Sequence, residues 1–171
     1  MSFDEIMQHM IAFIKQDPIA HYNFIIGTDS QAFSDHTKFV TGIVLQRETK
    51  GAWACYTLHV EPRKIRSIKE KLSIETACSE NIAYLFKDGK LQILEDIILP
   101  YVYKGATFNT YVDIDAGTDI VRNKTAPYVK EMMLRVESLG MTPRVKPDAC
   151  IASGYADKQS KKSTKLLVAN K

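Results

Sequence analysis

Hydrophobic residues at the start of the chain recur with the spacing of an amphipathic helix. Ser2, followed by Glu5 three residues later, forms a capping box, which marks a helix N-terminus. Asp17-Pro18 ends the segment, so residues 1–17 are predicted to form a helix on the outside of the fold. Its apolar stripe consists of Phe3, Ile6, Met7, Met10 and Ile14.

Three segments with the composition of β-strands follow this helix, at residues 23–29, 38–48 and 51–61. Lys50-Gly51 separates the last two, which is typical of a hairpin turn. Because the connections are short, the three strands are predicted to pair antiparallel to one another.

The rest of the chain alternates helical and strand patterns. Ser67 caps a helix that is predicted to run to about Phe86. The later predicted elements are a helical stretch at 90–102, a strand at 107–114, a helix at 118–139 with a restart at Pro127, a short strand at 148–152 after Pro147, and a basic helix from about Gly154. This order predicts an α/β fold in which a mixed five-stranded sheet, with three antiparallel strands and then two helix-separated strands, is flanked by helices.

Composition agrees with one soluble globular domain covering residues 1–171, in which 1–17 is an added helix. The chain is 45% hydrophobic and 25% charged, and no apolar run is long enough to span a bilayer. The N-terminus is acidic, unlike a signal peptide. Cys55, Cys78 and Cys150 are odd in number and lack metal-ligand spacing, so we expect a reducing, cytoplasmic compartment and no membrane partner.

Two acidic residues lie near the ends of apolar strands, where an unpaired carboxylate is costly to bury. Asp29 ends the segment 23–29, and Asp113 is the next-to-last residue of the segment 107–114. Strand alternation places Ile25, Gly27 and Asp29 on one face, and Gly27 leaves open space that a ligand would use. The pattern predicts a metal site assembled on a sheet.

Three further acids are candidates for the same site. Glu75 lies in the helix after the third strand, within an apolar stretch, and Asp157 is predicted to begin the last helix. Asp115 shares a strand face with Asp113, but Asp115-Ala116-Gly117 is an ordinary turn sequence, so Asp115 is an additional rather than a primary candidate ligand. Each acid taken alone has a structural explanation; their joint placement is what favours a site.

Basic residues are concentrated in two segments. Residues 63–71 carry five basic residues against one acid, and residues 158–171 carry five lysines and no acid. Such segments suit a polyanionic partner such as nucleic acid, although solvated helix faces have the same composition. The candidate contacts to nucleic acid are Lys158, Lys161, Lys162 and Gln31.

The order of strands and acids resembles the ribonuclease H-like superfamily, and within it the YkuK-type ribonuclease H-like family. The resemblance spans nearly the whole chain after about residue 20. It rests on Gly27-Thr28-Asp29-Ser30-Gln31, Val112-Asp113-Ile114, Lys146-Pro147-Asp148-Ala149 and Ala152-Ser153-Gly154-Tyr155-Ala156-Asp157-Lys158. The leading helix and the helix at 90–102 depart from the minimal plan of that superfamily.

The resemblance implies a metal-dependent nuclease. It places Asp29, Asp113 and Asp157 at the superfamily's aspartate positions, with Glu75 as a fourth acid. It implies an RNase H-like phosphodiesterase that cleaves RNA, an RNA–DNA hybrid or structured DNA with two Mg²⁺ or Mn²⁺ ions. Asp29 would bridge both ions, Asp113 and Glu75 would hold one, and Asp157 the other.

Two other functions fit the same residues. One is a non-catalytic nucleic-acid-binding module that keeps the fold and its basic surface. The other is a relative that shares the fold and performs other phosphate chemistry, since a fold alone does not determine function. The choice between RNA and DNA, and the oligomeric state, are left open by the sequence.

Overall fold

A mixed five-stranded sheet, in the order β3-β2-β1-β4-β5, forms the centre of the molecule. The structure is a computed structural model that describes residues 1–169, with side chains up to Gln159 and that of Lys161. β1 pairs antiparallel with β2, β2 pairs antiparallel with β3, and β4 and β5 run parallel to β1. The strands are β1 (His21–Ala32), β2 (Thr37–Arg47), β3 (Gly51–Glu61), β4 (Thr107–Gly117) and β5 (Thr142–Lys146). The predicted α/β architecture is confirmed.

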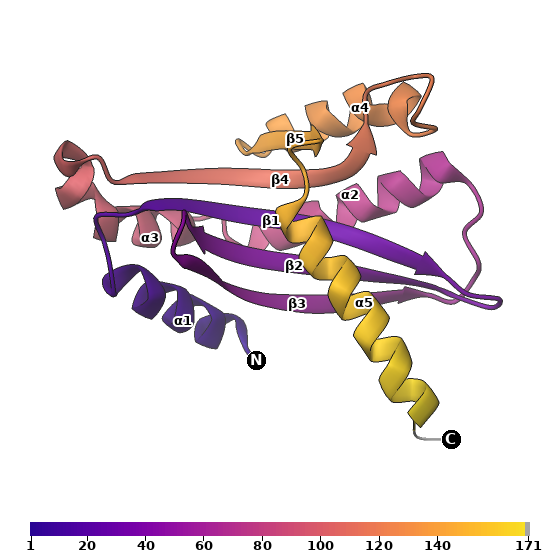
Figure 1. Ribbon diagram of the computed structural model, residues 1–171, viewed down its shortest axis with the longest axis horizontal. Helices are drawn as coiled ribbons and strands as arrows, with labels where there is room; N and C mark the ends of the chain where they lie inside the picture. The colour runs from indigo at the N-terminus through magenta and orange to yellow at the C-terminus, as the bar shows by residue number, and fades with distance from the viewer. Residues whose placement is uncertain (170–171) are drawn as a thin grey trace.

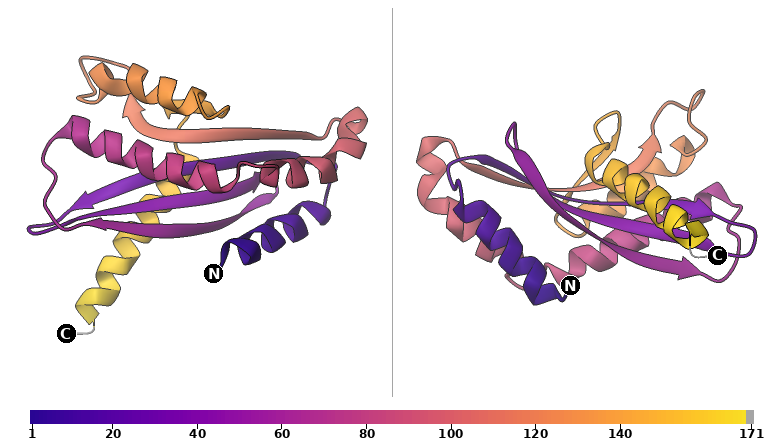
Figure 2. Two further views of the ribbon diagram at one scale, coloured as in Figure 1. Left: turned by 180° about the vertical axis from the view of Figure 1, so that it is seen from behind. Right: turned by 60° about the horizontal axis from the view of Figure 1, so that its bottom comes forward.

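Helices cover both faces of this sheet unequally (Figures 1 and 2). One face packs against most helices and carries the large core, to which Phe24 and Ile26 of β1 contribute. The opposite face packs against α5 alone among the helices within residues 1–169, through a small cluster of Ile25, Val44 and Ala152. The helices are α1 (Phe3–Lys15), α2 (Ile68–Leu85), α3 (Lys90–Ile98), the 3₁₀ helix η1 (Leu99–Lys104), α4 (Ala126–Glu137) and α5 (Ile151–Ala169).

The first two helices begin where the sequence predicts. Ser2 and Glu5 form the complete capping box of α1, and Ser67 caps α2 by accepting the backbone N–H of Glu70. Met7, Met10 and Ile14 of α1 are buried, so the added N-terminal helix contributes to the core. No helix within residues 1–169 is both long and apolar enough to cross a membrane.

Two predicted helices differ from those observed. The predicted helix at 118–139 begins only at Ala126, because Pro127 lacks a backbone N–H and is tolerated only in the first turn of a helix. Residues 118–125 form a loop instead. The predicted stretch at 90–102 is divided at Leu99, where the 3₁₀ helix η1 begins with Pro100 in its first turn.

The predicted strand at 148–152 was wrong. The last strand lies earlier, at Thr142–Lys146, and ends before Pro147, which has no N–H to donate to a neighbouring strand. The backbone N–H groups of Asp148 and Ala149 both donate to the carbonyl of Val145, which closes a turn. As a result α5 begins at Ile151 rather than near Gly154, and Asp157 lies in its second turn.

α5 packs across the sheet at a pair of glycines on two neighbouring strands. Gly27 of β1 and Gly42 of β2 are register partners. A Cβ atom at Gly27 would lie 2.9 Å from the Cβ of Ala152, and one at Gly42 would lie 2.9 Å from the carbonyl oxygen of Ala152. The space beside Gly27, which the sequence suggested for a ligand, is therefore filled by the start of α5.

Gly27→Ala should lower the free energy of unfolding by about 1–3 kcal/mol, because the new methyl group overpacks the contact with α5. Gly154→Ala is the matched control: it lies within α5, a Cβ there meets nothing within 4 Å, and it should stabilise the protein by roughly 0.5–1 kcal/mol. Urea unfolding of both variants tests this. Equal stability of Gly27→Ala and the parent would contradict the close packing.

Candidate active site

Asp29 and Asp115 lie side by side at the ends of two parallel strands. Gly27 and Asp113 are register partners between β1 and β4, so the acids two residues further along each strand emerge from the same face. Asp29 and Asp115 line two adjoining depressions, of about 250 Å³ and about 300 Å³. These two carboxylates are the centre of the acidic site.

Glu75 reaches the first depression from α2, and Asp157 reaches the second from α5. Glu75 is buried and accepts a hydrogen bond from the hydroxyl of Ser30, which follows Asp29 on β1. Asp157 is partly exposed and pairs with Lys161 one turn later, at 2.6 Å. The two helices on opposite faces of the sheet thus each bring one acid to the Asp29–Asp115 pair.

Burial and mutual repulsion change the titration of two of these acids. Burial, followed by the negative charges of Asp115 and Asp157, raises the pKa of Asp29 to about 6. Burial raises the pKa of Glu75 to about 8, with smaller contributions in the same direction from Asp29 and Asp115. Excess negative charge of this kind is relieved by a proton or by a bound cation.

Asp113 has different surroundings from those predicted. Its side chain is fully buried, and one oxygen lies 2.7 Å from Nε of Arg144 on β5. The other oxygen accepts the backbone N–H of Ala152, near the start of α5, at 3.1 Å. Burial raises the pKa of Asp113 although Arg144 acts to lower it. Asp113 lines neither depression, so these contacts favour a structural role, and its predicted metal role remains a prediction.

Arg144 contacts Tyr111 as well as Asp113. Its guanidinium lies over the ring of Tyr111, 4.5 Å from the ring centre, and is mostly buried. Asp113 therefore joins β4, β5 and α5, and it sets where the helix that carries Asp157 begins.

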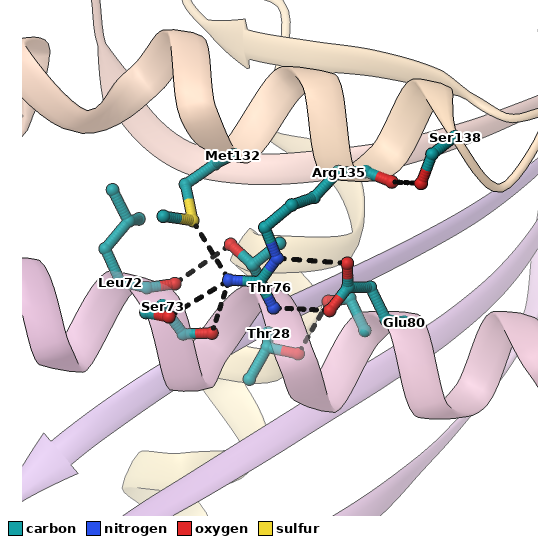
Figure 3. Close-up of polar contacts among 9 residues, drawn as sticks. Thr28, Leu72, Ser73, Thr76, Glu80, Met132, Arg135 and Ser138 are labelled. Atoms are coloured by element: carbon teal, nitrogen blue, oxygen red, sulfur yellow. Dashed lines mark hydrogen bonds and ion pairs between the residues drawn. The ribbon is translucent and has the colours of Figure 1, made fainter.

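α2, which carries Glu75, is attached by polar contacts on two sides (Figure 3). Its Ser79 hydroxyl shares a hydrogen bond with Thr28 of β1 at 2.8 Å. On the other side Arg135 of α4 binds Glu80 and donates to the hydroxyl of Ser73 at 3.0 Å. These contacts lie on the turns before and after Glu75 and limit how far its carboxylate can move.

Lysines surround the acids, and the sequence did not single out most of them. Lys71 and Lys124 line the first depression, and Lys146 lines the second, where it pairs with Asp115 at 2.6 Å. Lys71 lies in the basic segment 63–71, but nothing in the sequence distinguished it from its neighbours. Of the predicted nucleic-acid contacts, Lys158 is exposed, Gln31 is half-buried at the end of β1, and the side chain of Lys162 lies outside the described residues.

The carboxylates have the chemistry of a site for Mg²⁺ or Mn²⁺, which prefer oxygen ligands. Within the described side chains, however, no three acids, histidines or cysteines lie close enough together to hold one ion. Ser30, Lys146 and Lys161 instead bind one carboxylate each. A divalent ion would have to replace these contacts, and Lys146 and Lys161 are exposed enough to turn away.

Comparison with known proteins confirms the predicted family. The model of the ribonuclease H-like family matches residues 5–161. Uncharacterized protein YkuK of Bacillus subtilis (strain 168) is 38% identical over 161 residues, covering 94% of this chain and 92% of that protein. No solved structure matches the chain.

Stability should fall as pH rises from about 4.5 to about 8 in the presence of EDTA. Over this range the folded protein, with its raised pKa at Glu75 and Asp29, binds more protons than the unfolded chain does. Glu75→Gln keeps an acceptor for Ser30, and its stability should lose most of this dependence on pH. The variant should therefore become increasingly more stable than the parent as pH rises. Urea unfolding at several pH values measures this; parallel curves for parent and variant would contradict it.

Asp113→Asn should lower the free energy of unfolding by about 3–5 kcal/mol, because it leaves Arg144 as an uncompensated buried charge. Asp115→Asn is the matched control on the same strand face and should cost less than about 1 kcal/mol, since it also removes repulsion with Asp29. Urea unfolding in EDTA compares them. Equal losses in the two variants would refute the distinction drawn between the two acids.

Proposed function

The chain belongs to the ribonuclease H-like family, and we propose that it hydrolyses phosphodiester bonds in RNA, an RNA–DNA hybrid or structured DNA with Mg²⁺ or Mn²⁺. Family membership supports a nuclease-like or nucleic-acid-related function. The observation that carries the finer proposal is the Asp29–Asp115 pair, shared by two depressions whose other walls carry Glu75 and Asp157.

The four acids would hold the cations in this proposal, with Asp29 and Asp115 between the positions supported by Glu75 and Asp157. Bound divalent ions would supply a nucleophile at neutral pH and neutralise charge on the reacting phosphate. This assignment gives Asp115 the role that the sequence prediction gave to Asp113. One oxygen of Asp113 already binds Arg144, and the other accepts a backbone N–H from α5.

The lysines around the site suit a polyanionic substrate. Lys71 and Lys124 approach from one depression, and Lys146 and Lys161 approach from the other. If a cation neutralised the carboxylates, the ammonium groups of Lys146 and Lys161 would become available to phosphate oxygens of the substrate. The same groups that pair with the acids in the absence of substrate would then position the nucleic acid.

A non-catalytic nucleic-acid-binding module is the second candidate function. It is favoured by the finding that, among the described side chains, no three acids gather around one point, while two of them pair with lysines. In that case the acids would only orient lysines that bind the phosphate backbone.

Cleavage of labelled single-stranded RNA, RNA–DNA hybrid and branched DNA should require Mg²⁺ or Mn²⁺ and cease in EDTA. Asp29→Asn and Asp115→Asn should each reduce the cleavage rate by at least about 100-fold, since each loses an anionic ligand and keeps its volume. Asp88→Asn is the control, because Asp88 is exposed at the far end of α2 and its φ of 56° is one that Asn adopts readily.

If Asp29→Asn kept full activity, the proposed catalytic site would be ruled out. Absence of cleavage on every substrate, combined with binding that weakens steeply with salt, would establish the binding module instead.

A further inference from the structure

The loop between β4 and α4 presents two large apolar side chains to water. Ile120 is 80% exposed and its neighbour Val121 is 95% exposed. Single exposed apolar residues are ordinary, but two adjacent β-branched residues this far out of contact give up most of the stabilisation that burial would provide. Nothing within the described residues covers them.

The loop nevertheless has a defined shape. The carboxylate of Asp119 accepts the backbone N–H of Val121 at 2.9 Å and that of Arg122 at 3.3 Å. The backbone N–H of Asn123 donates to the carbonyl of Asp119, and Asn123 packs so closely on Gly117 that a Cβ there would lie 2.3 Å from its amide nitrogen. The apolar pair is therefore held outward by the fold of the loop.

The loop also borders the acidic site. Gly117, its anchor, is two residues beyond Asp115, and Lys124 lines the depression that contains Asp29, Glu75 and Asp115. Arg122 lies between the apolar pair and Lys124 in sequence and is largely exposed, at 3.5 Å from Asp119. Along the chain from Lys124 back to Ile120, the residues thus run from the lining of the depression, through exposed Arg122, to the exposed apolar pair.

We propose that this loop is a substrate-contacting element in which Ile120 and Val121 pack on the face of an unstacked base while Arg122 and Lys124 bind the adjoining phosphates. The inference rests on the proposed function and names its substrate class: nucleic acid with an unpaired nucleotide beside the bond to be cleaved. Base faces are apolar and are exposed only where stacking is interrupted. A continuous duplex would therefore present only its phosphates to the loop.

Ile120→Ser/Val121→Ser should abolish a preference that the parent shows for unpaired nucleotides. Fluorescence anisotropy in Ca²⁺ buffer would compare a fully paired DNA duplex with a duplex of equal length that has a central bulge. We expect the parent to bind the bulged duplex about tenfold more tightly and the double variant to bind both equally, at the affinity of the parent for the paired duplex.

Val102→Ser/Tyr103→Ser is the matched control, because these side chains are 52% and 80% exposed beside Lys104 at the opposite end of β4. It should keep the preference for the bulge. The inference is overturned if the parent has no preference, if the double loop variant retains it, or if the control loses it equally.

A cleavage assay with Mn²⁺ on the same two duplexes separates this inference from the proposed function. If the parent cleaves both duplexes at equal rates and the loop variant matches it, the loop proposal fails while the nuclease proposal stands. If the parent neither binds nor cleaves these duplexes but cleaves RNA or an RNA–DNA hybrid, the loop proposal fails and the nuclease proposal stands. If it cleaves none of the substrates, both fail. If the loop variant loses activity only on the bulged duplex, both are supported.

Discussion

The buried ion pair between Asp113 and Arg144 is the interaction on which the arrangement around the acidic site depends. One oxygen of Asp113 meets the guanidinium from β5, and the other accepts a backbone N–H from α5. A carboxylate buried this completely is tolerated only while its partners stay in place. β4, β5 and the start of α5 are therefore positioned together, and the place of Asp157 relative to Asp115 follows from residues outside the two depressions.

The two faces of the sheet position their acids by different means. On the α5 face, Gly27 and Gly42 let the backbone of Ala152 approach so closely that α5 packs on the sheet in one position. On the α2 face, hydrogen bonds from Thr28 and Arg135 hold the helix on both sides of Glu75. Asp29 and Asp115 lie between these two supports, on strands that pair directly with each other.

In the acidic site, the negative charges of the carboxylates are partly offset by the positive charges of neighbouring lysines. Burial raises the pKa of Asp29 and Glu75, and the negative charges of neighbouring acids add to the effect. Lys146 and Lys161 offset part of this charge through exposed side chains that can exchange a carboxylate for a phosphate. A site with this balance suits an anionic substrate that arrives together with a cation, which is the chemistry we propose for the protein.

Much of the fold was predictable because it depends on local pattern. Strand alternation, the Ser2 and Ser67 caps and the Lys50-Gly51 turn identified the first three strands and the first two long helices. The motifs around Asp29, Asp113, Pro147 and Asp157, with the order of strands, identified the family. The last strand was misplaced because a short strand such as Thr142–Lys146 has too few residues to show a period, and its pairing with β4 is what defines it.

The acids show where sequence reasoning ends. Asp113 and Asp115 share one strand face, and alternation cannot tell which of them points into a depression and which meets a buried arginine. That choice follows from the register that places Arg144 opposite Asp113, and from the close approach of α5 to the glycine pair. The sequence alone determined the first four strands, the family and which residues carry charge. Only the tertiary structure decided which charges neutralise one another, because that depends on contacts between segments distant in the chain.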